Sequence, residues 1–472
     1  MKDPALLDLS EAADEIANGR LSSVEATNAC LNRIEAWQPA VNAFISIDRE
    51  GAFAQAAERD RELARGYRRG PLHGVPLAHK DLLLRAGRVT TAGSKIMRDT
   101  VADSTSSLLE RLDDAGAVNL GTLHMSEFAA GPTGHNVHYG PCRNPYHRDH
   151  ITGGSSSGSG AAVAARLIYG ALGSDTGGSI RLPAANNGIV GMKATYGRIT
   201  RHGAIARSWS LDHFGPMTRT ARDCALMLQV VAGHDPRDAT SSSRPVPDYL
   251  AAFSDTSLAG IRIGIPEEAI LREIDPEIMA TMEATIRTLE SLGATTKTVQ
   301  LPNLKLLLLT AETIIKSEAA TMHRRWLATR PQHYASQVRL RLEVGFVIPA
   351  TQYIDALRLR AHFTREFLDG TMGDIDMLHL PVMPFPVPTI ADTDVEGDGG
   401  EAVAAMVGRV TTLTRPFNFL GVPALSVPAG FCTKGLPIGL QFIGHPFDEG
   451  LLLRIAHAFQ SVTEFHRGVP EL

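Results

Sequence analysis

The sequence lacks the features that mark disulfide-rich, zinc-binding and membrane-spanning proteins. Its four cysteines form no C-x-x-C pair, which argues against a disulfide framework or a zinc site and is typical of a reducing compartment. No uncharged apolar run reaches the ~18 residues of a membrane span, and the acidic, amphipathic start of the chain is unlike a signal peptide. With 46 basic and 51 acidic residues, the net charge of −5 indicates no surface for nucleic acid. We therefore expect a cytoplasmic protein without direct nucleic-acid or membrane partners.

What the sequence does have is the composition of a large globular protein. Of its 472 residues, 44% are hydrophobic and 21% are charged, which are ordinary values for a chain with a sizeable core. Strand-like and helix-like segments alternate, and this alternation predicts an α/β fold. We expect one large domain over 1–472. It should contain a helical N-terminal segment over 1–66, a core with the candidate catalytic residues over 67–240, and, over 241–472, the second part of the sheet together with helices of a substrate pocket.

Two serine-rich turns flank one apolar, helix-length run between Ile151 and Ser179. The turns read GGSSSGSG and SDTGGS, and Ser155 and Ser179 lie 24 residues apart. A helix followed by a short strand would return the chain to its starting point. Two hydroxyls and several free backbone N–H groups would then share one small volume. Acyl transfer needs such a cluster, because it requires a nucleophile, a proton relay and donors aimed at a developing oxyanion.

Three other interpretations of these turns are weaker. Flexible linkers are often rich in glycine and serine, but a linker joins polar neighbours, and these turns flank the apolar run AAVAARLIYGALG. A phosphate-binding loop would end in Gly-Lys-Ser/Thr, which neither turn does. The pattern G-x-S-x-G fits Gly154, Ser156 and Gly158, so a nucleophile elbow with Ser156 as the nucleophile stays an alternative, although serine-rich runs match this short pattern by chance.

Lys80 is the candidate general base. It follows a short apolar strand and lies between GVPLA and LLL. A lysine in such a place ordinarily extends to solvent, but burial there would lower its pKa by disfavouring the ammonium. In a mechanism that combines three residues, Ser179 attacks an acyl carbon, Ser155 relays the proton and Lys80 accepts it. The backbone N–H groups of the second turn would face the oxyanion: Thr176, Gly177, Gly178 and Ser179.

The sequence does not predict a metal site. Several histidines fall in the loop-rich segment that ends at residue 150, namely His124, His135, His138, His147 and His150. None of them forms an H-E-x-x-H or comparable ligand pair on one helix, so we interpret them as loop histidines in polar surroundings. We therefore expect metal-independent chemistry that uses no cofactor.

Four motifs resemble the amidase signature family in their order and their gaps: GVPLAHKD, GGSSSGSGAAVAA, GSDTGGSIRLPA and GIVGMKATYGR. The resemblance extends less sharply over nearly the whole chain. It implies that Ser179 is the nucleophile, Ser155 the bridging serine after a cis Gly154–Ser155 bond, and Lys80 the base. It also implies a set of structural supports: Ser156, Asp175 and Arg181. The implied fold is a central mixed, mostly parallel sheet of about eleven strands wrapped by helices, and the implied activity is hydrolysis of linear amides through an acyl-enzyme.

Within that family the chain is similar to the A subunit of the tRNA-dependent glutamine amidotransferase, through HMSEFA, SLDHFGPMTRT, AGHDPRDATS and PFDEGLLLRIAHAF. Two departures distinguish it. Where that subunit carries Met-Gly-Ser-Ser-Thr-Glu-Asn, residues 130–136 of this chain read AGPTGHN. Thr411 stands where the resemblance implies an aspartate that grips the amino group of glutamine. Without that acid a substrate ammonium would be left unpaired, at a penalty of about 3–5 kcal/mol.

These departures favour a free-standing amidase of less polar amides, small aryl or aliphatic, with carbamates as a further substrate class. The acyl pocket is expected at a small-residue loop and at two residues further along the chain: Ala129, Gly131, Thr133, Arg341 and Thr411. The resemblance implies that Arg341 grips a substrate carboxylate. The alternatives are the glutaminase A subunit of an amidotransferase and, in another class, a catalytically silent binding scaffold. The expected partners are a small-molecule amide and water, with the chain as a monomer or homodimer.

Overall fold

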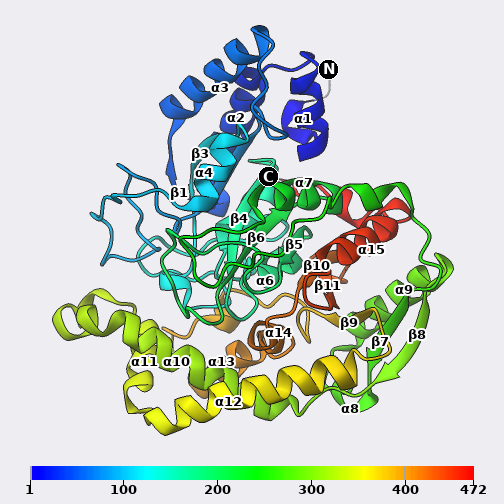
Figure 1. The fold of residues 1–472 in the computed structure, drawn as a ribbon. Helices are drawn as coiled ribbons and strands as arrows, with labels where there is room; N and C mark the ends of the chain where they lie inside the picture. Colours follow the sequence, from blue (N-terminus) through cyan, green and yellow to red (C-terminus); the bar gives the residue numbers. More distant parts are fainter. Residues whose placement is uncertain (1–2, 398–399, 472) are drawn as a thin grey trace.

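One mixed sheet runs through the molecule (Figure 1). The structure is a computed structural model that describes residues 3–397 and 400–471. Within these residues eleven strands lie side by side in the order β1-β3-β2-β4-β6-β5-β10-β11-β9-β7-β8, which confirms the expected α/β class and strand number. The strands are β1 Phe44–Ile47, β2 Pro76–Lys80, β3 Val118–Leu123, β4 Gly170–Asp175, β5 Val190–Lys193, β6 His213–Thr218, β7 Arg262–Pro266, β8 Thr295–Val299, β9 Met377–Pro381, β10 Ala424–Phe431 and β11 Pro437–Gly444.

The expectation that most strands are parallel is wrong. Six of the ten pairings among the described strands are antiparallel: β1–β3, β4–β6, β5–β6, β5–β10, β10–β11 and β9–β11. The parallel pairings join β2 to β3 and β4, and β7 to β8 and β9. Antiparallel neighbours need only a short connection, and residues 432–436 alone join β10 to β11. The helix–strand alternation therefore indicated the two parallel groups but not the antiparallel strands between them.

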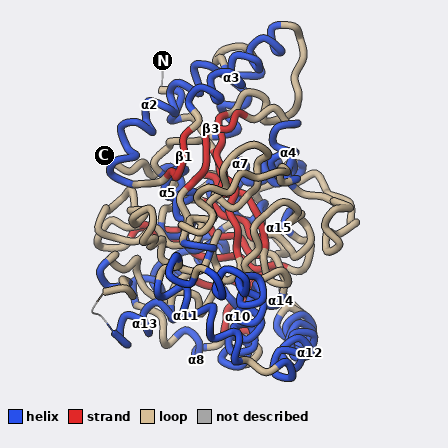
Figure 2. The backbone as a smooth tube through the Cα atoms, turned by 90° about the vertical axis from the view of Figure 1, so that its left-hand side faces the viewer, coloured by secondary structure: helices blue, strands red, loops and turns tan. Residues whose placement is uncertain are grey.

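Helices surround the sheet (Figure 2). They are α1 Leu9–Ala17, α2 Ser23–Val41, α3 Arg49–Ala64, α4 Ser107–Asp114, α5 Ser157–Ala164, α6 Arg181–Asn186, α7 Ala221–Val231, α8 Glu268–Leu271, α9 Pro276–Ser291, α10 Leu304–Thr329, α11 Ser336–Glu343, α12 Ala350–Glu366, α13 Gly400–Arg409, α14 Arg415–Leu420 and α15 Glu449–Ser461. The N-terminal segment contains α1 to α3 as expected, and it also contributes the edge strand β1. Helices α1 to α3 lie at one end of the molecule and α10 to α12 at the other (Figure 1).

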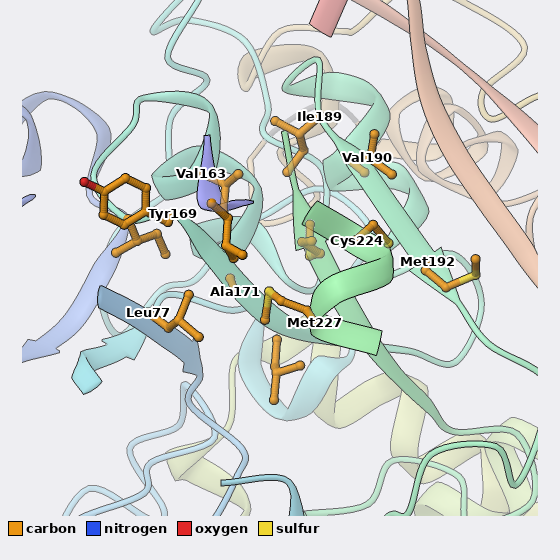
Figure 3. Close-up of a cluster of buried hydrophobic side chains, with 14 of the residues drawn as sticks. Leu77, Val163, Tyr169, Ala171, Ile189, Val190, Met192, Cys224 and Met227 are labelled. Atoms are coloured by element: carbon orange, nitrogen blue, oxygen red, sulfur yellow. The ribbon is translucent and has the colours of Figure 1, made fainter. Parts of the chain in front are cut away.

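A dense apolar core around α5 fixes the first serine-rich turn in place. Figure 3 shows Leu77 of β2, Ala171 of β4 and Met227 of α7 meeting in this core, and all three are buried. Helix α5 consists of small residues that are buried throughout. A Cβ at Gly158 would collide with backbone atoms of the neighbouring chain. Helix α5 therefore packs directly against backbone, and this close packing positions the serines that precede it.

The described cysteines are buried and form no disulfide. Burial raises the pKa of the Cys30 and Cys142 thiols to about 12, so neither is a thiolate nucleophile at neutral pH. Among the residues that the structure describes, no helix combines the length and the apolar character needed to cross a membrane.

Candidate active site

The side chain of Lys80, at the end of β2, is completely buried and surrounded by hydroxyl groups. Its Nζ lies 2.6 Å from Ser155 Oγ, 3.0 Å from Ser156 Oγ and 2.9 Å from Ser174 Oγ. Burial lowers the pKa of Lys80 well below its ordinary value, and the charges of two more distant carboxylates offset only part of this effect. The environment therefore favours the neutral amine, which is the form that can accept a proton.

Ser155 lies in the first serine-rich turn and is fully buried. The peptide bond Gly154–Ser155 is cis, as the family resemblance implied. The carbonyl oxygen of Ser155 accepts a hydrogen bond of 3.2 Å from the N–H of Ser126. The N–H of Ser156 donates to the carbonyl oxygen of Ser179 at 3.2 Å, so the two serine-rich turns are in direct contact. This contact is what the predicted return of the chain through α5 and β4 requires.

Ser179 lies in the turn between β4 and α6 and lines a cavity. Two side chains hold this turn from outside it. Thr176 Oγ1 donates to Asp212 Oδ1 at 2.6 Å, and Thr414 Oγ1 donates to the carbonyl oxygen of Gly177 at 2.7 Å. Ser179 is thus presented to the cavity on a backbone that is anchored on both sides, whereas the other two predicted triad members lie behind it in the protein.

The three predicted oxyanion donors differ in their hydrogen bonding. The N–H of Gly178 donates to Asp175 Oδ1 at 2.6 Å, and the φ of Gly178 is +127°, which glycine adopts far more readily than other residues. The N–H groups of Thr176 and Gly177 have no acceptor within the described residues, and both residues line the cavity beside Ser179. Thr176 and Gly177 therefore have N–H groups free to bind an oxyanion, whereas the N–H of Gly178 stabilises the turn.

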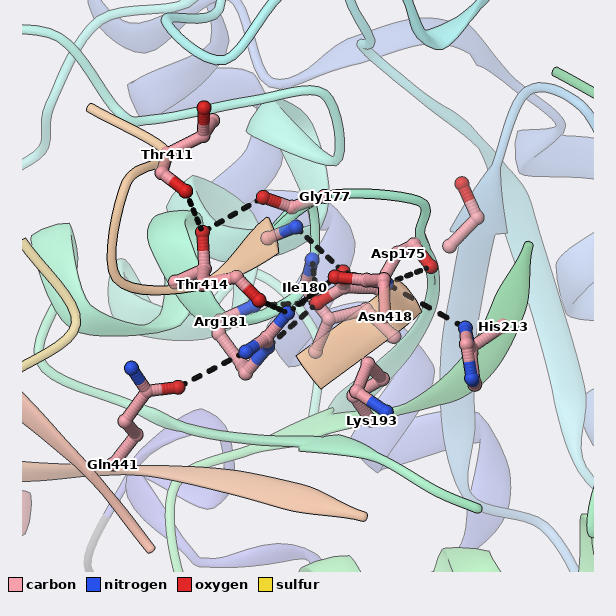
Figure 4. Close-up of polar contacts among 12 residues, drawn as sticks. Asp175, Gly177, Ile180, Arg181, Lys193, His213, Thr411, Thr414, Asn418 and Gln441 are labelled. Carbon is pink, nitrogen blue, oxygen red and sulfur yellow. Dashed lines mark hydrogen bonds and ion pairs between the residues drawn. The ribbon is translucent and has the colours of Figure 1, made fainter. Parts of the chain in front are cut away.

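Behind the turn, Asp175 and Arg181 form a fully buried ion pair (Figure 4). Arg181 Nε lies 3.0 Å from Asp175 Oδ2, and the guanidinium also donates to Gln441 Oε1, to Asn418 Oδ1 and to the carbonyl oxygen of Thr414. Burial alone would raise the pKa of Asp175, but the charge and hydrogen bonds of Arg181 hold it well below its usual range. The pair is therefore ionised and joins the turn to α14 and β11.

Several of these polar residues escaped sequence reasoning. Ser174 directly precedes Asp175 in SDTGGS and contacts Lys80, so the motif itself contained the signal. Asn418 and Gln441 are single polar residues inside the apolar runs PFNFLG and GLQFIG. An isolated polar side chain in a buried segment needs a partner, and this signal could have identified both residues but not the partner of either.

A cavity of about 890 Å³ opens over Ser179. This volume falls within the roughly 300–1,000 Å³ of small-molecule sites. Apolar side chains from the segments around α8 and α10 form part of its wall: Ile270, Leu304, Leu308, Leu309 and Ile315. The catalytic turn and the loop that begins at Ala129 border the same space. The cavity can therefore hold a small substrate with its reacting carbon at Ser179.

Four of the five residues predicted to bind substrate line this cavity: Ala129, Gly131, Arg341 and Thr411. Thr133 is buried and lies outside the described lining. Arg341 Nη1 donates to the carbonyl oxygen of Ala130 at 2.7 Å, which ties α11 to the small-residue loop. Arg415 Nη2 donates to Thr411 Oγ1 at 2.6 Å. The structure brings these segments together, while their roles toward a substrate stay predictions.

Known proteins resemble this chain over nearly its full length. A family model described as Amidase matches residues 25–453. The A subunit of the Glutamyl-tRNA(Gln) amidotransferase of Pseudomonas aeruginosa is 40% identical over 487 residues, which cover 98% of this chain and 99% of the relative. A solved structure of a vestigial protein complex, described for an s-triazine catabolic enzyme, is 34% identical with a TM-score of 0.89 and covers 96% of this chain and 98% of that one. The peptide amidase from Stenotrophomonas maltophilia is 31% identical with a TM-score of 0.83, at 98% coverage of both chains.

Fold, site and relatives together define a class of enzyme that hydrolyses C–N amide bonds. The chain belongs to the amidase family, as its four sequence motifs indicated. Its similarity to the A subunit of the glutamyl-tRNA(Gln) amidotransferase is likewise confirmed.

Proposed function

We propose that the chain hydrolyses small linear amides through an ester on Ser179, with Ser155 as the proton relay and Lys80 as the base. The neutral amine of Lys80 accepts the proton of Ser155 while Ser155 accepts that of Ser179, and the Ser179 oxygen bonds to the carbonyl carbon. The proton returns along the same path to the amide nitrogen, the C–N bond breaks, and an amine or ammonia leaves. Water then attacks the ester and releases the acid and Ser179.

The observation that carries this proposal is the buried amine of Lys80 at 2.6 Å from Ser155, in a turn that contacts the backbone of Ser179. Of the serines in question, Ser179 is the one that lines the described cavity. Ser156 is fully buried, and its Oγ donates to the carbonyl oxygen of Ser174 at 3.2 Å. This placement supports a structural role for Ser156 rather than that of an elbow nucleophile.

Single serine substitutions test the assignment. Ser179→Ala should abolish acyl-enzyme formation, measured by mass spectrometry of reactions quenched in denaturant. Ser155→Ala should slow acylation by about 10²-fold or more, because it removes the proton relay. Ser156→Ala should retain the acyl-enzyme, and the exposed Ser104→Ala serves as the matched control. An acyl-enzyme that persists in Ser179→Ala but disappears in Ser156→Ala would make Ser156 the nucleophile and refute the proposal.

A second candidate is a glutaminase subunit of a tRNA-dependent amidotransferase. The 40% identity with such a subunit over nearly the whole chain supports this candidate at least as strongly as a free-standing amidase. Thr411 speaks against it, because the family resemblance implies an acid at that position for the amino group of glutamine. The isolated chain should be assayed with aryl, aliphatic and carbamate substrates and with glutamine. Activity on glutamine alone, and only beside further subunits, would establish the second candidate.

The expectation of a less polar acyl group is not retained. It rested on the absence of an acid at Thr411, and it did not foresee the charges of the opposite sign in the same cavity. The guanidinium groups of Arg207, Arg341 and Arg415 line the space beside Ser179. The apolar wall fits a short hydrocarbon segment, whereas these cations bear on the other end of the acyl group.

A further inference from the structure

Three guanidinium groups border the cavity beside Ser179 without a carboxylate partner. Among the described residues none of the three, Arg207, Arg341 and Arg415, forms an ion pair within 4.0 Å. Arg341 donates to a backbone carbonyl, and Arg415 donates to the hydroxyl of Thr411. The side chain of Arg207 has no hydrogen-bond partner in the part of the chain that the structure describes. Partly buried cations that lack a counter-charge favour an anionic ligand.

Two of these arginines are attached to the turn that presents Ser179. A Cβ at Gly177 would lie 3.6 Å from Cγ and Nε of Arg415, so the Arg415 side chain packs against the catalytic turn. The backbone N–H of Arg207 donates to Asp212 Oδ2 at 2.8 Å, and the other oxygen of this carboxylate accepts from Thr176 at 2.6 Å. Both guanidinium groups are therefore held close to the acyl carbon of a bound substrate.

The remaining charges of the cavity do not neutralise the arginines. Its other charged lining residues are Lys305, Lys316, Glu273 and Glu312. Lys316 Nζ lies 2.9 Å from Glu312 Oε1, so these two neutralise each other. Burial would raise the pKa of Glu312, but the hydrogen bond and charge of Lys316, with the more distant Arg415 and Arg341, hold it below its usual value. An excess of positive charge therefore remains beside Ser179.

Electrostatics within the cluster agree with this geometry. Burial lowers the pKa of Arg207 to about 10, and the charges of Arg341 and Arg415 contribute to the shift. Arg207 is still protonated at neutral pH, so three cations repel one another in a partly desolvated space. A bound anion would relieve this repulsion and replace lost hydration.

We propose that the acyl group of the substrate carries a carboxylate, which binds at Arg207, Arg341 and Arg415, so that the chain hydrolyses monoamides of dicarboxylic acids. This inference rests on the proposed function and specifies its substrate class. Arg207 and Arg415 are then specificity-determining residues in addition to Arg341. Because Arg415 donates to Thr411, the position that the resemblance assigns to an acid is next to a cation here. It attracts a carboxylate and repels the ammonium of glutamine.

Three amides with the same five-carbon chain test the inference: glutaramate, L-glutamine and valeramide. We expect kcat/KM, measured by ammonia release, to be about 100-fold or more higher for glutaramate than for valeramide, because each charge-assisted hydrogen bond contributes roughly a factor of 10 to 100. Glutamine should be a poorer substrate than glutaramate. Succinamate and adipamate, each against the neutral amide of equal length, extend the comparison to other spacings.

Variants assign the effect to residues. Arg207→Gln and Arg415→Gln should each reduce the glutaramate-to-valeramide ratio of kcat/KM by about 10-fold or more, chiefly through KM. The exposed Arg287→Gln is the matched control and should leave the ratio unchanged. Equal rates on charged and neutral amides, or a preference for glutamine, would overturn the inference and leave the amide hydrolysis intact.

Binding separates this inference from the function on which it rests. In Ser179→Ala, calorimetry should show that glutaramate binds at least about 10-fold more tightly than valeramide. Preferential binding without any turnover by the wild-type chain would refute the proposed function but not the anion site. Equal or absent binding of the two amides would refute the anion site.

Discussion

Replacing Asp175 with asparagine tests the polar network behind the catalytic turn. The carboxylate accepts hydrogen bonds from the N–H of Gly178 at 2.6 Å, from Arg181 Nε at 3.0 Å and from Asn418 Nδ2 at 2.8 Å. Asparagine preserves the shape but removes the charge, and it turns an NH₂ group toward groups that are themselves donors. Removing one partner of a buried ion pair destabilises a protein by about 3–5 kcal/mol. We expect the lower end of this range, because Arg181 keeps its neutral acceptors.

The assay is urea unfolding at pH 7, followed by circular dichroism and compared with the wild-type chain. Asp355→Asn is the matched control, since Asp355 also pairs with an arginine but its side chain is 65% exposed. This control should change the free energy of unfolding little. Acylation by Asp175→Asn should also slow under conditions where the variant is folded, because the Gly178 turn loses its anchor.

The pH dependence gives the sign of the effect. The folded state holds the pKa of Asp175 below its unfolded value of about 3.9, so the contribution of Asp175 to stability is fully present above that value. It is lost as the pH falls toward the lowered pKa. The difference between wild type and Asp175→Asn should therefore be constant from about pH 5 to 8 and should narrow below about pH 4. A difference under about 1 kcal/mol at pH 7 would refute the account of this network.

Two further substitutions test the base and the turn. Lys80→Met should slow acylation by about 10²-fold or more. It should also remove the rise of the acylation rate with pH, which stopped-flow pH profiles measure; a residual rate with an unchanged profile would exclude Lys80 as the base. Gly178→Ala should destabilise the chain by about 1–3 kcal/mol or more, because alanine disfavours a φ of +127° and its Cβ would collide with the Thr414 hydroxyl. Thermal unfolding checks this result against Gly435→Ala, which has positive φ but open space, and equal losses would exclude the collision.

The reacting groups could be predicted because they lie in short segments with unusual composition. Lys80 interrupts an apolar stretch, and Ser155 and Ser179 occupy turns that flank a run of small apolar residues. The structure places the Lys80 amine against Ser155 and joins the two turns through a backbone hydrogen bond. The family resemblance supplied the number of strands, which neither composition nor periodicity reveals.

Features that depend on contacts between distant segments could not be predicted. Strand β10 pairs with β5, although more than two hundred residues separate them in the sequence, and this pairing is antiparallel. Arg207 and Arg415 resemble ordinary surface arginines in the sequence, because nothing in their neighbourhoods shows that both border one cavity. The loss of an acid at Thr411 was visible, but the cation that accompanies it became evident only from the hydrogen bond between Arg415 and Thr411.

The chemistry and the proposed specificity come largely from different parts of the chain. The groups assigned to bond making lie between Lys80 and Arg181, and most of the cavity lining comes from the region around α10 to α14. Asp212 is a bridge between the two, since its carboxylate binds both the Thr176 hydroxyl and the backbone of Arg207. A substitution at Thr411 or Arg415 can therefore change the charge offered to an acyl group without displacing the amine of Lys80 from Ser155. This separation explains how relatives named for a peptide amidase and for an amidotransferase share one fold with this chain.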